Sequence, residues 1–214
     1  VGLSAAAYEE ALAYAKDRKQ FGKAIIEFPA VYDMLATIKA KLDAGRALLY
    51  QTSRYVDIYK ALDDIARERK LTPEERQEQK RYAKLADSFT PLAKGMNSEY
   101  ANQNAYDCIQ VHGGSGFMME YACQRIYRDA RITSIYEGTT QLQTVAAIRY
   151  VTNGAYAATL HEYELIPCAP EFEGYLNRIK DMTRKLEACT NAVKEAQNQE
   201  LLDFVARRLY EMAA

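Results

Sequence analysis

The chain has 214 residues, 49% of them hydrophobic and 27% charged, which is typical of a globular protein long enough to bury a core. Its 28 basic and 29 acidic residues nearly cancel, leaving a net charge of −1. This balance argues against nucleic-acid binding, which would need a basic excess on one face. No apolar run approaches the ~20 residues of a membrane span, so we expect no membrane-spanning segment.

The four cysteines show no metal-binding pattern. Cys108, Cys123, Cys168 and Cys189 lack CxxC spacing, and the chain has only two histidines. The spacing therefore predicts no metal site. Single thiols within helical patterns indicate small buried hydrophobes in a reducing compartment, so we expect a cytoplasmic protein.

The first half of the chain carries helical periodicity. Apolar side chains recur at helical spacing in residues 2–20, 30–60 and 74–111, and the first of these helices has a face of small residues. Gly22 and the Phe28-Pro29 pair separate the first two helices. Thr72-Pro73-Glu74-Glu75 predicts the start of the third, which Pro91 should bend. The charged stretch 63–82 between them is typical of a solvated hairpin tip.

The second half continues in the same way. We expect helices over residues 120–131, 139–152, 171–195 and 199–212, with Asn153-Gly154 as a helix stop. No alternating strand pattern occurs. The sequence therefore predicts an all-α fold, an up-down four-helix bundle with a C-terminal helical extension. Its expected domains are a bundle over 1–152, a linker over 153–170 and the extension over 171–214. We expect the extension to be an interface element, with Tyr175 and Phe204 among its buried contacts.

Glu137 stands where the helical pattern breaks, between Tyr136 and Gly138 and just before the helix expected from Thr139. Glycine leaves room for a substrate to approach. The positive end of the following helix favours a carboxylate there, whereas an apolar ligand would desolvate it. Such a carboxylate suits a general base, although an acidic residue in a first helical turn also has a purely structural explanation.

A glycine-rich turn follows the third helix, at Gln110-Val111-His112-Gly113-Gly114-Ser115-Gly116-Phe117. Adjacent glycines allow a ligand close to the backbone, but glycine pairs between helices are also ordinary connectors. The turn is neither a P-loop nor a GxGxxG turn after a strand. A further candidate is Arg18-Lys19-Gln20-Phe21-Gly22-Lys23, where Arg18 can cap helix carbonyls or hold a phosphate.

Together these segments resemble the C-terminal helical domain of the acyl-CoA dehydrogenase family. The resemblance rests on Arg18 to Lys23, on Gln110 to Phe117, on Tyr127-Arg128-Asp129-Ala130-Arg131 and on Ile135-Tyr136-Glu137-Gly138-Thr139-Thr140-Gln141, in that order and spacing. It covers about residues 1–152. Each motif alone is weak evidence, whereas the set is specific.

The resemblance implies an FAD-dependent enzyme that oxidises acyl-CoA thioesters to 2-enoyl-CoA. Glu137 would remove the α-proton, and Tyr136 and Gly138 would line the substrate site. The implied FAD contacts concern two different FAD molecules. The cofactor of a neighbouring subunit would be contacted by Arg18, Gln20 and Phe21 and also by Gln110, Gly113 and Gly114. The subunit's own cofactor would be contacted by Thr139 and Gln141. Shared cofactor sites imply a homodimer or homotetramer, with electron-transfer flavoprotein as the electron acceptor.

Three features depart from the usual family pattern. Phe28-Pro29-Ala30 stands where many members have glutamine, residues 57–80 are longer than the usual connection, and residues 153–214 extend past the usual end. The last two resemble the larger subgroup that includes enzymes acting on 3-methylmercaptopropionyl-CoA. Because the family also has an N-terminal helical domain and a middle β-domain, and because the chain opens within a helical pattern, we expect a fragment that is inactive by itself.

Two other functions share this architecture. Acyl-CoA oxidases and nitroalkane oxidases pass electrons to oxygen, and the nitroalkane group uses aspartate as its base, which disfavours it here. A non-enzymatic FAD-binding scaffold or DNA-associated relative is the other alternative. The near-balanced charges of residues 171–214 disfavour nucleic acid as its partner.

Overall fold

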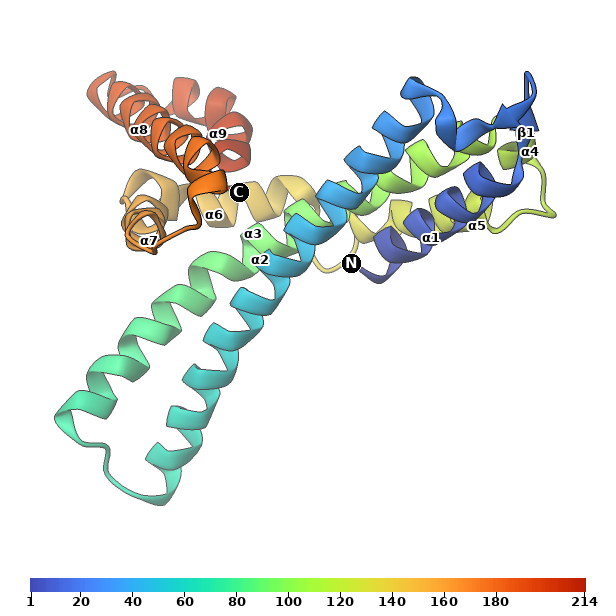
Figure 1. Cartoon of the computed structure of the whole chain (residues 1–214). Coiled ribbons are helices and arrows are strands. Elements are labelled where there is room, and N and C mark those ends of the chain that lie inside the picture. The colour runs from blue at the N-terminus through green and yellow to red at the C-terminus, as the bar shows by residue number, and fades with distance from the viewer. The chain divides into compact units, whose positions relative to one another are not determined.

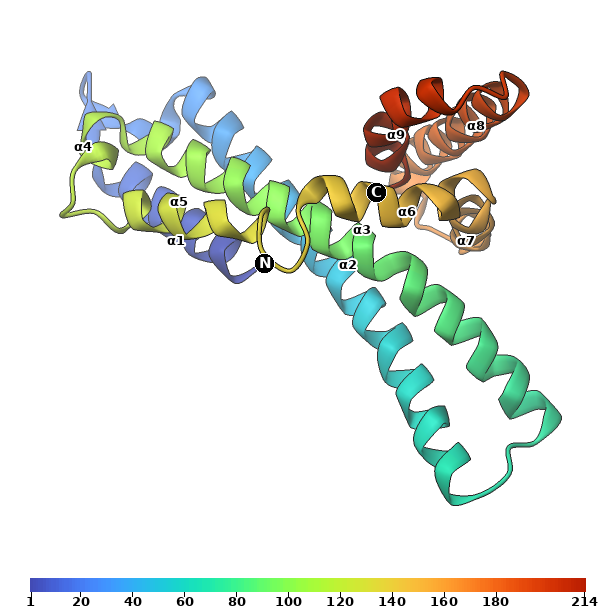
Figure 2. The same ribbon diagram turned by 180° about the vertical axis from the view of Figure 1, so that it is seen from behind.

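A computed structural model describes all 214 residues, and nearly all of its regular structure is helical (Figures 1 and 2). The α-helices are α1 (Gly2–Asp17), α2 (Pro29–Glu68), α3 (Pro73–His112), α4 (Gly114–Phe117), α5 (Ala122–Thr133), α6 (Thr140–Thr152), α7 (Ala155–Glu164), α8 (Glu173–Glu195) and α9 (Gln199–Ala213). Two 3-10 turns, η1 (Ile25–Glu27) and η2 (Pro170–Phe172), precede α2 and α8. The strands β1 (Lys19–Gln20) and β2 (Lys23–Ala24) form a small antiparallel hairpin. None of the helices combines the length and apolar character that crossing a membrane requires.

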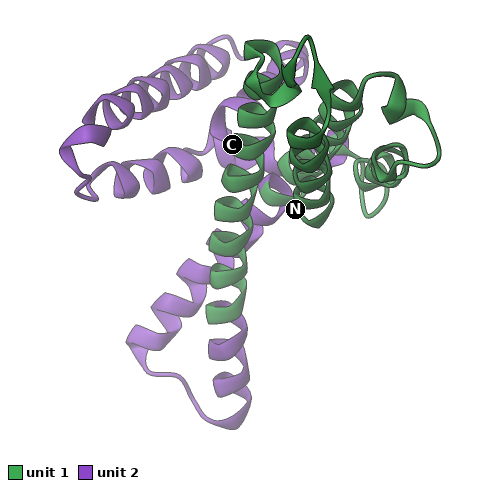
Figure 3. Cartoon of the chain, turned by 45° about the vertical axis from the view of Figure 1, so that its right-hand side comes forward, with its two compact units in different colours: residues 1–58, 93–140 green, residues 59–92, 141–214 purple.

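The helices fall into two compact units that interleave along the sequence (Figure 3). The first unit consists of residues 1–58 and 93–140, and the second of residues 59–92 and 141–214. The long helices α2 and α3 therefore each contribute one segment to each unit.

The core of the first unit begins with a stripe of alanines on α1. Ala7, Ala11 and Ala15 repeat every four residues, so they lie on one helix face, and all three are fully buried. α1 packs against α5, whose Cys123, Ile126 and Ala130 belong to the same buried cluster. Small side chains on both helices allow this close packing.

Close contact between α2 and α3 continues that core. Leu35 and Ile38 of α2 are buried in the cluster with Ala105 of α3. A Cβ at Gly45 of α2 would lie 2.3 Å from Oδ1 of Asn97 on α3, so a larger residue there would displace the Asn97 side chain.

In the second unit, the end of α2 and the start of α3 form a helical hairpin. Its turn is capped reciprocally, because the backbone N–H of Thr72 donates to the Glu75 carboxylate (2.9 Å) and the N–H of Glu75 donates to the Thr72 hydroxyl (3.2 Å). Arg69 donates two hydrogen bonds to the same carboxylate. The Arg69 side chain, followed by the Thr72 backbone bond, lowers the pKa of Glu75 to about 2.

Two buried tyrosines join the C-terminal helices to this hairpin within the second unit. The hydroxyl of Tyr156 on α7 donates to the carbonyl of Ser88 (2.5 Å), and its ring meets the Phe89 ring edge-on. The hydroxyl of Tyr210 on α9 donates to the carbonyls of Pro91 and Leu92 (3.1 and 3.2 Å). Both rings are almost fully buried, and their polar tips are satisfied.

Most expected helices are confirmed, and the all-α prediction with them. Pro29 and Pro73 begin α2 and α3, and Gly154, in a left-handed conformation, ends the helix before it. The helix expected over residues 2–20 instead ends at Asp17, because the chain turns into the β1–β2 hairpin.

The C-terminal region contains more helix than expected. The expected linker over residues 153–170 contains α7, whose Tyr156, Ala157 and Thr159 are buried. Tyr175 and Phe204, which we expect to be buried at an interface, are mostly exposed within this chain. The buried face of α8 and α9 is instead formed by Leu186, Ala206, Leu209 and Tyr210.

Candidate functional site

A pocket of the first unit lies where α1 ends and the glycine-rich turn after α3 begins. It has a volume of about 480 Å³. Five of the expected cofactor residues line it, Arg18, Gln20, Phe21, Gly113 and Gly114. The structure thus brings together two sequence motifs that are about ninety residues apart. Gln110 lies one turn earlier on α3, is exposed and does not line the pocket.

The glycine turn leaves its backbone open to a ligand. Gly113 has φ +61 and caps α4, and a Cβ at Gly113 or Gly114 would meet no atom within 4 Å. Gly116 has a different role, because a Cβ there would lie 2.6 Å from the Ile109 carbonyl oxygen. The first two glycines therefore fit a ligand that approaches the main chain, and the third is needed for packing.

A tight hairpin forms another wall of the pocket. Phe21 and Gly22 connect β1 to β2 with φ values of +50 and +85, a two-residue turn of the kind that suits strand twist. Phenylalanine is unusual at positive φ, and its ring is 94% exposed. Lys23 lies 4.4 Å above the ring of Phe28, which meets Phe21 edge-on. The hairpin therefore holds an apolar side chain out toward solvent at the pocket's edge.

Arg18 supplies positive charge at this pocket. It is the residue at which α1 ends, and its backbone N–H donates to the Tyr14 carbonyl (2.9 Å). Its exposed guanidinium forms no ion pair within the chain. The backbone of Arg18 therefore caps helix α1, and the charge of its side chain is available to an anionic ligand.

The pocket is also lined by polar residues that the sequence did not predict as cofactor contacts. The His112 ring stacks on Tyr14 with centroids 4.2 Å apart, and its Nδ1 lies 2.8 Å from the Cys108 carbonyl oxygen. A carbonyl can only accept, so Nδ1 carries a proton and donates it to this carbonyl. The Tyr14 hydroxyl donates to Ser115 Oγ (3.2 Å). Tyr14, His112 and Ser115 all line the pocket. Their position in the glycine-rich turn, or opposite it, was the only feature of the sequence that could have indicated this.

Glu137 lies beside a second, smaller pocket of about 180 Å³ in the same unit. Its carboxylate is exposed, as expected, and Tyr136 lines the same pocket from the preceding position. The backbone of Glu137 is left-handed (φ +51), and Gly138 follows with φ +91. A non-glycine residue at such a φ costs about 1–3 kcal/mol and is often found at functional sites.

The remaining predicted residues flank Glu137 without sharing one pocket. Gly138 and Thr139 are half-buried in the turn before α6, and Gln141 is exposed in the first turn of that helix. None of the three lines the pocket beside Glu137. Nearby, the Thr140 hydroxyl donates to the Glu99 carboxylate (2.7 Å), which fixes the start of α6.

The cysteines are divided between the interior and the surface. Cys108 and Cys123 are fully buried, and Cys168 and Cys189 are exposed. Burial, followed by the neighbouring Cys123, raises the pKa of the Cys108 thiol to about 12. No group of three His, Cys, Asp or Glu side chains could hold a metal ion.

Family comparisons agree with this arrangement of helices and motifs. The sequence model described as "Acyl-CoA dehydrogenase, C-terminal domain" matches residues 1–151, and a second, "Acyl-CoA dehydrogenase C terminal", matches residues 152–214. The chain belongs to the acyl-CoA dehydrogenase family. The resemblance drawn from the motifs is thereby confirmed.

Two curated relatives illustrate how far the similarity extends. The caffeyl-CoA reductase-Etf complex subunit CarC of Acetobacterium woodii is 36% identical over 143 residues, which cover 67% of this chain and 31% of that protein. The 3-methylmercaptopropionyl-CoA dehydrogenase of Ruegeria pomeroyi is 37% identical over 152 residues, 67% of this chain and 24% of that protein. The chain thus spans about a third or less of these relatives.

Solved structures extend the match to the C-terminal helices. An acyl-CoA dehydrogenase from Bacillus anthracis, solved with FAD, matches 99% of this chain and 37% of its own, with a TM-score of 0.72 and 25% identity. Caenorhabditis elegans ACDH-11, solved with C11-CoA, also matches 99% of this chain, with a TM-score of 0.76. At 20% identity, this second likeness concerns the fold alone.

Proposed function

We propose that this chain is the C-terminal helical part of an FAD-dependent acyl-CoA dehydrogenase and that Glu137 is its catalytic base. The observation that carries the proposal is the carboxylate of Glu137, exposed on a strained left-handed backbone beside a pocket that Tyr136 also lines. Family membership supports the reaction class.

In the proposed reaction, Glu137 accepts the α-proton of an acyl-CoA thioester. The thioester carbonyl makes this proton acidic enough to lose, and a carboxylate in reach of it is a suitable base. Bound FAD would take up the hydride that leaves the β-carbon, so that the product is a 2-enoyl thioester. Tyr136 and Gly138 would lie along the acyl-CoA, and covering the site would exclude water from the carboxylate.

The larger pocket fits the nucleotide part of FAD. Its open Gly113 and Gly114 backbone can approach a pyrophosphate, and Arg18 offers a positive charge without a competing partner. Gln20 and Phe21 would complete this contact, with Gln110 one turn away. Thr139 and Gln141, near Glu137, would hold a different FAD molecule. Two such sites on one chain support a homodimer or homotetramer that shares its cofactors between subunits.

The complete protein would pass its electrons to an electron-transfer flavoprotein. The name of the Acetobacterium relative, a subunit of an Etf complex, supports this partner, and the name of the Ruegeria relative supports a related acyl-CoA substrate. Peroxide formed during turnover in air, in stoichiometric yield, would instead point to an oxidase.

The test is to mix the complete protein with a panel of acyl-CoAs and to follow bleaching of the flavin absorbance. Glu137→Gln should abolish bleaching and retain FAD, because the amide keeps the shape of the side chain but cannot take the proton. Glu171→Gln, an exposed glutamate on η2, is the matched control and should behave as wild type. Normal bleaching in Glu137→Gln would remove this residue from the mechanism.

A further inference from the structure

The turn that carries Glu137 is closed by its own backbone. The N–H groups of Ile135 and Tyr136 donate to the Ile132 carbonyl (2.9 and 3.0 Å), and the N–H of Thr140 donates to the Ser134 carbonyl (3.1 Å). Within this loop, Glu137 and Gly138 are both left-handed. The backbone strain at Glu137 must be offset by contacts that hold the turn in place.

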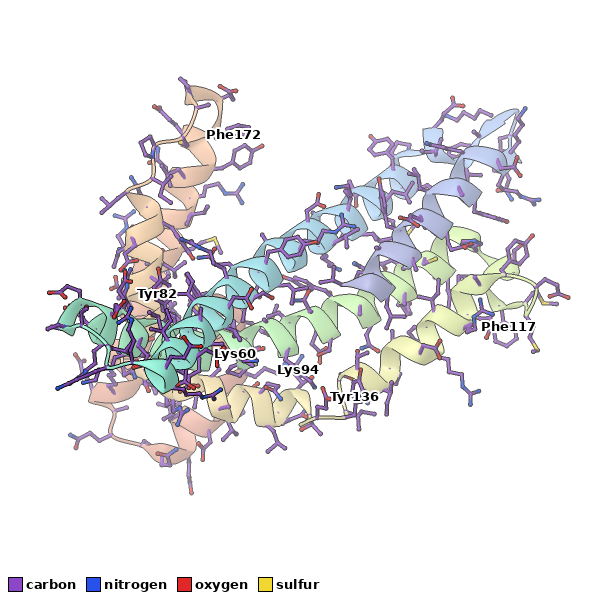
Figure 4. All side chains as sticks on the ribbon, turned by 90° about the horizontal axis from the view of Figure 1, so that it is seen from below. Lys60, Tyr82, Lys94, Phe117, Tyr136 and Phe172 are labelled. Atoms are coloured by element: carbon purple, nitrogen blue, oxygen red, sulfur yellow. The ribbon has the colours of Figure 1, made fainter.

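Lys94 of α3 provides such a contact from 44 residues earlier in the chain. Its Nζ donates to the Gly138 carbonyl at 2.5 Å. Five residues further along α3, the Glu99 carboxylate accepts from the Thr140 hydroxyl. Figure 4 labels Lys94 on α3 and Tyr136 on the turn, and the two side chains line one pocket with Glu137. One helix therefore anchors the turn at Gly138 and again at Thr140, directly after Glu137.

The same lysine brings positive charge to this pocket. Lys94 is half-buried, and burial lowers its pKa, while the carboxylates of Glu137 and Glu99 oppose that shift. The ammonium therefore lies in the field of both carboxylates. Removing water from the pocket would strengthen this interaction, because the local dielectric constant would fall.

We propose that Lys94 is the positioning residue for Glu137, which it serves by holding the Gly138 carbonyl and by placing a positive charge beside the carboxylate. The inference rests on the proposed function, in which Glu137 is the base. A lysine at this position provides both a hydrogen-bond donor and a positive charge, whereas a neutral side chain would provide only the hydrogen bond.

The first test compares Lys94→Met, Lys94→Gln and Lys94→Arg in the complete protein. Lys94→Met should lower kcat by about tenfold to a hundredfold, because the base is misplaced, with little change in KM. Lys94→Gln should recover part of this loss if the hydrogen bond dominates, and Lys94→Arg should recover more if charge contributes. Lys84→Met, an exposed position on the same helix, is the matched control.

The second test does not depend on turnover. Amide hydrogen exchange at residues 137–140 should accelerate in Lys94→Met, whereas the α3 amides around Ala105 should keep their protection. In folded Glu137→Gln protein, the pKa of Lys94, followed by NMR of its side chain, should fall, because one of the two opposing carboxylates is gone. This measurement leaves Lys94 in place, so it stands even where a Lys94 variant fails to fold.

The outcomes separate the two proposals. If Glu137→Gln abolishes bleaching while Lys94→Met retains wild-type kcat and exchange at residues 137–140, only the role of Lys94 is refuted. An unchanged Lys94 titration in Glu137→Gln would also refute it. If the flavin of the Glu137→Gln variant bleaches normally, the proposed role of Glu137 as the base is refuted, whatever the Lys94 variants show.

Discussion

The ring of Tyr14 on α1 stacks on the ring of His112 at the end of α3, with centroids 4.2 Å apart and planes inclined by 23°. Tyr121 meets both rings edge-on, at 5.8 Å and 5.6 Å. Tyr14 and His112 line the larger pocket, and Tyr121 packs against both of their rings. The first prediction concerns this cluster.

Replacing Tyr14 with leucine should lower the free energy of unfolding by about 0.5–1.5 kcal/mol beyond the loss of buried area, because two aromatic contacts disappear. Tyr14→Phe keeps the ring contacts and loses only the hydrogen bond to Ser115. Urea denaturation compares the two variants. Equal losses in both would show that the hydroxyl, and not the ring, is the stabilising group.

The alanine face of α1 has no room for larger side chains. Ala11 is fully buried against α5, so Ala11→Leu should destabilise the first unit by about 1–3 kcal/mol through overpacking. Ala13 lies on the exposed face of the same helix, and Ala13→Leu should change little. Thermal unfolding of the two variants measures the difference. Similar melting temperatures would contradict the close α1–α5 packing.

The two buried tyrosine hydroxyls of the second unit should each contribute to its stability. Tyr156→Phe and Tyr210→Phe remove hydrogen bonds to hairpin carbonyls, at an expected cost of about 0.5–1.5 kcal/mol each. Tyr175→Phe, at an exposed site on α8, is the control. Chemical denaturation gives the free energy of unfolding of all three variants. An unchanged free energy in both Tyr156→Phe and Tyr210→Phe would argue against these hydrogen bonds.

A histidine between two glutamates makes the stability of the second unit depend on pH. Nδ1 of His161 on α7 lies 3.1 Å from Glu164, and Nε2 lies 3.0 Å from Glu187 on α8. The Glu187 hydrogen bond, followed by that of Glu164, raises the pKa of His161. The folded state thus binds the proton more tightly than the unfolded state, so the added stability is full below about pH 6.5 and is lost as the pH rises through the folded pKa.

The second unit should therefore be more stable at pH 6 than at pH 8.5, and His161→Gln should reduce this difference. Because the histidine is half exposed, 1 M NaCl should weaken the effect in the wild-type protein. Denaturation midpoints at the two pH values provide the measurement. A pH difference of the same size in His161→Gln would assign it to other groups.

The sequence predicted best what depends on local backbone chemistry. Pro29 and Pro73 begin helices because proline lacks the N–H that a first helical turn does not use, and Gly154 ends one because it adopts a left-handed conformation. The motif residues that line the larger pocket were predicted from the family resemblance. Gln110, which the same resemblance included, does not line it.

What escaped prediction depends on contacts between distant residues. α7 was missed because its buried face consists of Tyr156, Ala157 and Thr159 rather than a stripe of large aliphatic residues. The contact between Lys94 and Gly138 joins residues 44 positions apart, and no local pattern encodes it. The left-handed backbone of Glu137 was equally hidden, because only the folded turn determines its φ.

The interleaving of the two units crosses the boundary between the two family models. The family-model boundary falls between residues 151 and 152, yet the segment after it shares a unit with hairpin residues 59–92. The rings and hydroxyls of Tyr156 and Tyr210 pack on Ser88 to Leu92 of that hairpin. The hairpin and the C-terminal segment, which are far apart in the sequence, therefore form one structural unit. Without the C-terminal segment, the carbonyls of Ser88, Pro91 and Leu92 would lose their tyrosine donors.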